Sequence, residues 1–162
     1  MAGTNAPADA RQLARRSQAA IRAKDREAWL GLFAADAVVA DPIGPSPLDP
    51  AGSGHRGVAA IAAFYDAVIA PNEQISFEIE RSYLCGDEVA DVGAIRTTLP
   101  GGKHVVVVRG VYTYRSDGAG LLVALRAYWE FDAAEIVEAS SGKPPASPRS
   151  STPTASSART AR

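Results

Sequence analysis

The stretch KHVVVVRGVYTY, residues 103–114, decides the fold class of this chain. Its β-branched and aromatic side chains predict one long strand. The turn Pro100-Gly101-Gly102 joins it to a preceding strand over Val89–Leu99, and a turn over Ser116–Gly120 joins it to a following strand over Leu121–Glu130. Three consecutive strands joined by short turns predict an antiparallel sheet.

The segments before these strands show helical spacing. Asp9 can cap a helix that carries Leu13, Ser17 and Ile21 and ends near Lys24. Two further helices are predicted over Arg26–Ala34 and Val58–Ile69, and two shorter strands are predicted over Val38–Asp41 and Ile75–Arg81. Helices that precede a run of strands predict an α+β fold, in which the helices pack on one face of a curved antiparallel sheet. The open end of such a cone is a natural ligand pocket.

Composition limits the possible functions. The chain has 162 residues, 46% of them hydrophobic, and a formal net charge of −1. We therefore expect one domain over residues 8–138, a disordered Ser/Pro/Ala-rich tail over residues 139–162, and no nucleic-acid partner. One cysteine and two histidines predict no disulfide, metal or cofactor. The absence of a signal-like segment or a long apolar run predicts a cytoplasmic protein without a membrane partner.

Three motifs resemble those of the ketosteroid isomerases, within the SnoaL-like and nuclear-transport-factor-2-like superfamily. AADAVVADPIG (residues 34–44) resembles the segment that carries the catalytic base, IAAFY (61–65) resembles the third helix, and RAYW (126–129) resembles the last strand. The resemblance runs from about Arg11 to Trp129. It implies a cone-shaped α+β barrel, with N-terminal helices packed on a curved mixed or antiparallel β-sheet.

Asp41 is the predicted general base. It follows an apolar strand and has hydrophobic neighbours, so desolvation should raise its pKa and strengthen it as a base. The resemblance implies that it lies at the pocket wall, where it would take a proton from the carbon next to a ketone. The alternative is that Asp41-Pro42 merely ends a strand and begins a turn.

The residues that would bind the enolate oxygen differ from those of well-studied family members. The resemblance places Ser17 where they have a tyrosine and Gly110 where they have an aspartate, so neither position supplies an acidic donor. Tyr112 and Trp129 are possible substitutes, and packing in the core is the alternative for both. A glycine at position 110 would widen the pocket for a bulky polycyclic ligand. Further apolar contacts with the substrate are predicted for Phe33, Phe64 and Tyr65.

Three functions remain open. The first is a steroid delta-isomerase-like enzyme that acts on a hydrophobic polycyclic ketone, with Asp41 as its base. The second is a non-catalytic binder of steroids or other hydrophobic ligands. The third is a polyketide cyclase or epoxide hydrolase, which would need a second acid, and Asp91 with Arg96 is the only candidate pair. The resemblance and the apolar residues on both faces of the strand over 103–114 predict a homodimer.

Overall fold

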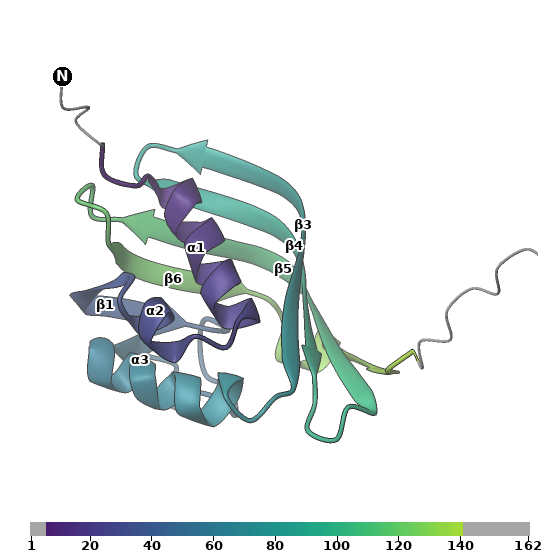
Figure 1. Cartoon of the computed structure of the whole chain (residues 1–162). Coiled ribbons are helices and arrows are strands. Elements are labelled where there is room, and N and C mark those ends of the chain that lie inside the picture. Colours follow the sequence, from purple (N-terminus) through teal and green to yellow (C-terminus); the bar gives the residue numbers. More distant parts are fainter. Residues whose placement is uncertain (1–5, 141–162) are drawn as a thin grey trace, which may run out of the picture.

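The computed structural model describes residues 6–140, with helices first and most strands afterwards (Figure 1). Helix α1 spans Ala10–Arg22 and begins at Asp9, as predicted. The Asp9 carboxylate accepts the backbone N–H of Gln12, and the Gln12 side chain accepts the N–H of Asp9, so two free donors at the helix start are satisfied. The buried face of α1 includes Leu13, Ser17 and Ile21, which therefore point toward the sheet.

The second predicted helix is too long by one turn. Helix α2 spans only Arg26–Leu30, and strand β1 already begins at Phe33 and runs to Ala40. A contact with a distant segment ends the helix early. The Leu122 N–H donates to the Leu32 carbonyl, and the pairing of β1 with the strand that contains Leu122 begins there. The third helix is confirmed as α3, Val58–Phe64, followed by a π-helical turn, η1, Tyr65–Ile69.

The sheet is mixed and has the order β2-β1-β6-β5-β4-β3. The long strands β3 to β5 and their partner β6 form an antiparallel set, and β1 joins β6 in parallel. The remaining bounds are β2 His55–Arg56, β3 Gln74–Cys85, β4 Glu88–Thr98, β5 His104–Ser116 and β6 Leu122–Tyr128. After a short 3-10 turn, η2 (Phe131–Ala133), a strand that was not predicted, β7 (Glu135–Glu138), pairs with the first half of β5.

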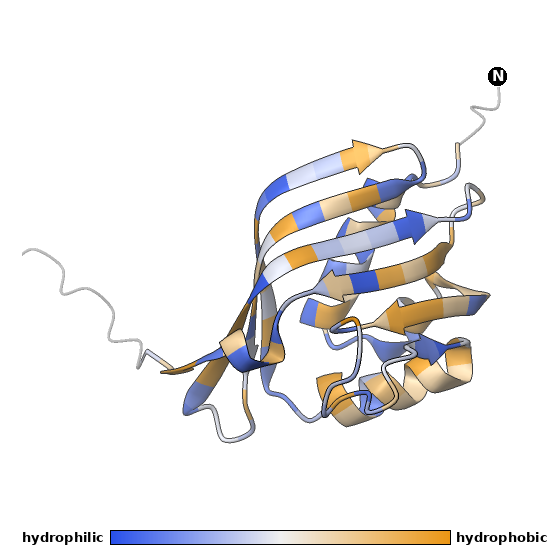
Figure 2. Ribbon diagram, turned by 180° about the vertical axis from the view of Figure 1, so that it is seen from behind, coloured by the Kyte–Doolittle hydropathy of each residue, from blue (hydrophilic) through white to orange (hydrophobic). Residues whose placement is uncertain are grey.

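The long strands curve around the helices, so the sheet has a covered inner face and an open outer face (Figure 1). The side chains of β5 divide between the two faces, and the strands of the sheet carry both hydrophobic and hydrophilic residues (Figure 2). Val106 and Val108 line the inner cavity, whereas Val105 and Val107 form a separate buried cluster with Ala94 on the other face. This arrangement is the predicted α+β cone. The predicted tail lies, from residue 141 onward, outside the described residues.

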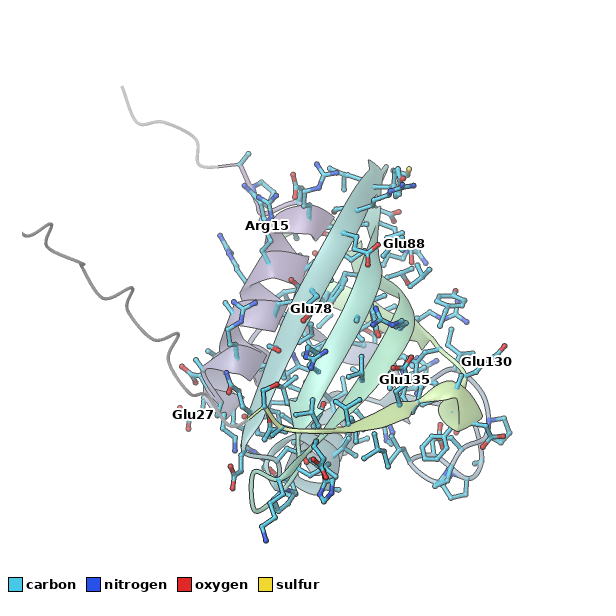
Figure 3. All side chains as sticks on the ribbon, turned by 90° about the vertical axis from the view of Figure 1, so that its right-hand side faces the viewer. Arg15, Glu27, Glu78, Glu88, Glu130 and Glu135 are labelled. Atoms are coloured by element: carbon cyan, nitrogen blue, oxygen red, sulfur yellow. The ribbon has the colours of Figure 1, made fainter. Side chains whose placement is uncertain are left out.

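Charged side chains also occupy the outer face (Figure 3). Arg96 faces Glu78 at 3.5 Å, and Arg109 faces Glu135 at 3.9 Å. These exposed pairs surround the outer apolar cluster, so the face mixes apolar and charged groups. The homodimer stays a prediction. Within residues 6–140, no helix is long and apolar enough to cross a membrane.

Candidate functional site

A cavity of about 500 Å³ lies between the inner face of the sheet and the helices. Its walls are mainly aliphatic and aromatic, with a few polar groups among them, which is the usual character of a site for a small apolar ligand. The helices contribute Ile21, Trp29 and Phe64, and the sheet contributes residues from β1 and from β3 to β7. The side of the cavity farthest from α1 is lined by exposed side chains, Phe131 and Ile136, which mark its mouth.

Asp41 lines this cavity, directly after the last residue of β1. Pairing of Ala40 with Arg126 of β6, and a bond from Ile43 N–H to the Ala127 carbonyl, hold the backbone on both sides of it. Its Oδ1 accepts a hydrogen bond of 2.6 Å from Nε1 of Trp129. The carboxyl is thus fixed at the wall of an apolar cavity by a strand on one side and an indole on the other.

The pKa of Asp41 is raised above its ordinary value. Burial is the main cause, because a carboxylate loses its hydration at an apolar wall. The Trp129 hydrogen bond and the nearby His55 act in the opposite direction, since both favour the charged form. A half-buried carboxylate with a raised pKa is a stronger base than a solvated one, and it can also hold a proton and return it.

Trp129 was predicted to donate to the ligand, but its indole N–H is already engaged with Asp41. Tyr112, the other predicted substitute, also lines the cavity. Its hydroxyl donates to the carbonyl of Val108 at 2.8 Å, and burial followed by the charge of Asp41 raises its pKa. Both expectations therefore need correction, because each donor already has a protein acceptor.

The prediction that Gly110 widens the pocket is wrong. Gly110 does not line the cavity, and a Cβ built on it would lie 2.2 Å from the carbonyl oxygen of Tyr128 and 3.0 Å from the Cβ of Trp129. Tyr128, at the end of β6, pairs with Val111 of β5, and the chain that follows passes close to Gly110. A glycine is needed for this close backbone approach rather than for the size of a ligand.

Ser17 does line the cavity. Its Oγ accepts a hydrogen bond of 2.9 Å from Nε1 of Trp29, and both side chains are buried. Of the predicted wall residues, Phe64 lines the cavity, but Phe33 and Tyr65 do not. They pack instead against Trp29, with ring centroids at 4.8 and 5.5 Å, so they support the wall from behind.

Three polar residues near the cavity were not predicted as a group. Gln18 Nε2 donates to Oδ2 of Asp91 at 2.8 Å, and the Gln18 side chain is close enough to the hydroxyl of Tyr114, which lines the cavity, to act on its pKa. All three side chains are buried. The sequence signal was a tyrosine two residues after Tyr112, which strand alternation places on the same face.

The second acid needed for an epoxide hydrolase is not assembled. Asp91 does not line the cavity and is held below α1 by Gln18. Arg96 lies on the outer face with Glu78. Asp91 and Arg96 are five residues apart on one strand, so their side chains are expected on opposite faces. Asp41 and Asp91 are separated by three strand spacings, about 14 Å at the backbone.

His55 lies in β2 and is half-buried. Its ring stacks on Phe64 with centroids 4.8 Å apart, and its Nε2 is buried without a hydrogen-bond partner among the described residues. It does not line the cavity, although it is close enough to Asp41 to favour the charged carboxylate. His55 is therefore part of the wall behind Phe64.

The loop between β1 and β2 closes the cavity beside Asp41. The carboxylate of Asp49 accepts the backbone N–H groups of Gly52 at 3.1 Å and Gly54 at 2.7 Å. This loop places Leu48 on the cavity wall. Within residues 6–140, no group of three or more His, Cys, Asp or Glu residues could hold a metal ion. The polar groups of the site are hence single side chains in an apolar surrounding.

The chain belongs to the SnoaL-like domain family, whose sequence profile matches residues 14–138. Its fold is similar to the crystal structure of the Δ5-3-ketosteroid isomerase from a Mycobacterium species, with 42% identity and a TM-score of 0.74 over 79% of this chain and 98% of that one. No match is found among curated proteins.

Two further solved structures are similar. RV0760c from Mycobacterium tuberculosis, in complex with estradiol-17β-hemisuccinate, has 38% identity and a TM-score of 0.72 over 78% of this chain and 97% of that one. A computationally designed 17-OHP binder has 36% identity and a TM-score of 0.74 over 79% of this chain and 98% of that one.

Proposed function

We propose that this chain is a steroid delta-isomerase-like enzyme that moves a proton next to a ketone of a steroid or another hydrophobic polycyclic substrate. The observation that carries the proposal is the Asp41 carboxyl, which has a raised pKa in an apolar cavity and is held by Trp129. The similarity to a ketosteroid isomerase over most of the chain supports it.

In this proposal, Asp41 acts twice. Its carboxylate takes a proton from the carbon between the ketone and the double bond, and the C–H electron pair moves into a dienolate whose charge lies on the ketone oxygen. The protonated Asp41 then returns the proton to the far carbon of the dienolate, so the double bond becomes conjugated and no net proton is gained or lost. A desolvated carboxyl suits both steps, because water does not compete for its proton.

The test is turnover of a 3-keto-Δ5 steroid by the purified protein, followed by the ultraviolet absorbance of the conjugated enone. We expect Asp41→Asn to slow turnover by about 10²–10⁴-fold, which is the usual contribution of a general base. Binding of a 3-keto-Δ4 product should be retained, since Asn keeps the shape and can still accept from Trp129. Equal rates for the two proteins would contradict the proposal.

A second candidate is a non-catalytic binder of steroids or similar hydrophobic ligands. Two observations favour it: Ser17 and Gly110 supply no acidic donor, and the N–H of Trp129 and hydroxyl of Tyr112 already have protein acceptors. The designed 17-OHP binder and the complex of RV0760c with estradiol-17β-hemisuccinate support a binding role. Tight binding of a 3-keto steroid without detectable isomerisation would favour this candidate. If no such steroid raised the melting temperature, both candidates would fail.

We also retain the homodimer and the cytoplasmic location as proposals. The outer face carries the buried cluster of Ala94, Val105 and Val107 and the exposed ring of Tyr128, which a second copy could cover. Sedimentation analysis of the purified chain tests the dimer, and a monomer at micromolar concentration would contradict it.

A further inference from the structure

The hydroxyl groups of the cavity differ in whether their protons are already engaged. The Tyr112 hydroxyl donates to the Val108 carbonyl, and the Trp129 N–H donates to Asp41. By contrast, neither Ser17 nor Tyr114 donates a side-chain hydrogen bond to another described residue, and both line the cavity. The oxygen of Ser17 accepts from Trp29, which leaves its own proton free. Among the buried hydroxyl groups of the cavity, the available donors are therefore Ser17 and Tyr114, whereas Thr97, which also lines the cavity, is only partly buried.

Tyr114 is held in place by a buried polar chain. Burial raises the pKa of the Tyr114 hydroxyl, and the neighbouring Gln18 side chain acts in the opposite direction, as an amide N–H beside a phenol oxygen does. The amide of Gln18 is itself oriented by Asp91, whose Oδ2 accepts from Nε2 at 2.8 Å. The carboxylate can only accept, so it fixes which end of the amide faces it. The Tyr114 hydroxyl thus lies beside an amide whose orientation is fixed by Asp91, and it donates its proton to no other described residue.

The other oxygen of Asp91 strengthens this interpretation. Oδ1 is buried and has no hydrogen-bond partner among the described residues, although Asp91 is only 4% exposed. A buried carboxyl that is only half satisfied costs free energy, so it needs an explanation beyond packing. Positioning of Gln18, and through it of Tyr114, supplies one.

Tyr114 and Ser17 line the same cavity as Asp41, and the charge of Asp41 acts on the Tyr114 hydroxyl. Tyr114 and Val39 both pair with Leu125 of β6, and Asp41 follows Val39 by two residues. Tyr114 is thus one row of inward side chains from Asp41 along the strands, about 7 Å, and two strands away across the sheet, about 10 Å at the backbone. A carbonyl oxygen that accepts from Tyr114 leaves the adjacent C–H facing the carboxylate.

We propose that Tyr114 and Ser17 donate hydrogen bonds to the carbonyl oxygen of the ligand, and that Asp91 is a positioning residue that holds Tyr114 through Gln18. The inference rests on the proposed function and names the electrophilic side of its site. It assigns the oxygen of a hydrophobic ketone to the covered end of the cavity and the carbon skeleton to the apolar walls toward Phe131 and Ile136.

The first test compares Tyr114→Phe with Tyr112→Phe as a matched control. The probes are androst-4-ene-3,17-dione and androst-4-en-17-one, which lacks the oxygen at carbon 3, and the readouts are Kd and the absorption maximum of the bound enone. Loss of one neutral hydrogen bond predicts about tenfold weaker binding of the dione to Tyr114→Phe. The enone absorption should shift to shorter wavelength, because the carbonyl is less polarised. Binding of the deoxygenated steroid should stay within about twofold.

Tyr112→Phe should leave both Kd values and the absorption maximum close to those of the wild type, since its hydroxyl serves Val108. An equal loss of both ligands in Tyr114→Phe would show that Tyr114 only packs, and would overturn the inference. A selective loss of the dione in Tyr112→Phe would overturn it as well. If wild type binds the two steroids equally, the inference fails while ligand binding stands. If it binds neither, the proposed function fails too.

The second test addresses Asp91. We expect Asp91→Leu to shift the enone absorption partly toward that of Tyr114→Phe, and Asp91→Asn to keep it, because Asn still offers an oxygen to Gln18. Gln18→Met is the second variant in case Asp91→Leu does not fold, and it should give the same partial shift. An unchanged absorption in Gln18→Met, with Tyr114→Phe shifted, would overturn the positioning role.

Discussion

Replacement of Trp129 by phenylalanine tests the electrostatics of Asp41 in detail. The indole N–H donates to Oδ1 at 2.6 Å, a hydrogen bond to a charged acceptor. Such bonds contribute about 1.5–3 kcal/mol. One pKa unit corresponds to about 1.4 kcal/mol, so the loss should raise the pKa of Asp41 further, by about one to two units. The shift is upward because the bond favours the carboxylate.

The assay is the pH dependence of kcat/KM for a 3-keto-Δ5 steroid. The base must be ionised, so activity falls as the pH drops through the pKa of Asp41. Trp129→Phe should move this acidic limb upward by about one to two pH units and leave the plateau at high pH within about tenfold of wild type.

Trp29→Phe is the matched control for this experiment. It removes an indole N–H whose partner is Ser17 rather than Asp41, so the acidic limb should stay in place. A limb that remains fixed in Trp129→Phe, or moves to lower pH, would refute the reasoning about Asp41.

Three further results are expected. Asp41→Asn should raise the melting temperature near neutral pH. The pKa of Asp41 is raised, so the folded state binds more protons than the unfolded state, and the wild type loses stability as the pH rises through the folded pKa. A gain in melting temperature that persisted at acidic pH would contradict this. Gly110→Ala should destabilise the fold by about 1–3 kcal/mol in urea titrations, because its Cβ would meet the Tyr128 carbonyl, and unchanged stability would argue against this close approach. Asp49→Ala should weaken steroid binding by freeing the loop that carries Leu48, measured as Kd, whereas an unaltered Kd would separate the loop from the site.

The elements of the fold with strong local signals could be predicted from the sequence. The cap at Asp9, the helix that begins at Val58 and the long strand of β5 follow from capping chemistry, helical spacing and β-branched residues. The boundary between α2 and β1 could not, because pairing with Leu122 begins the strand where local spacing favours helix. Strand β7 was missed because it is short and depends on pairing with β5.

In the candidate site, too, only the residue with a strong local signal could be predicted from the sequence. Asp41 could be found because its local motif carries the signal, and the structure places it on the cavity wall. The donors could not be assigned, because which hydroxyl has a free proton depends on contacts between distant segments, such as Gln18 with Tyr114. The prediction that Gly110 widens the pocket was wrong for a related reason. Strand alternation gives the face on which a residue lies, but not that the chain beyond β6 fills the space above it.

The most direct test of the central claim is a kinetic isotope effect. A 3-keto-Δ5 steroid carrying deuterium at carbon 4 is compared with its unlabelled form, for wild type and Asp41→Asn, at saturating substrate. If Asp41 removes this proton, the labelled substrate should react several-fold more slowly with wild type, and Asp41→Asn should lose turnover while it still binds the product. Rapid isomerisation by Asp41→Asn, with the same isotope effect as wild type, would show that another group is the base.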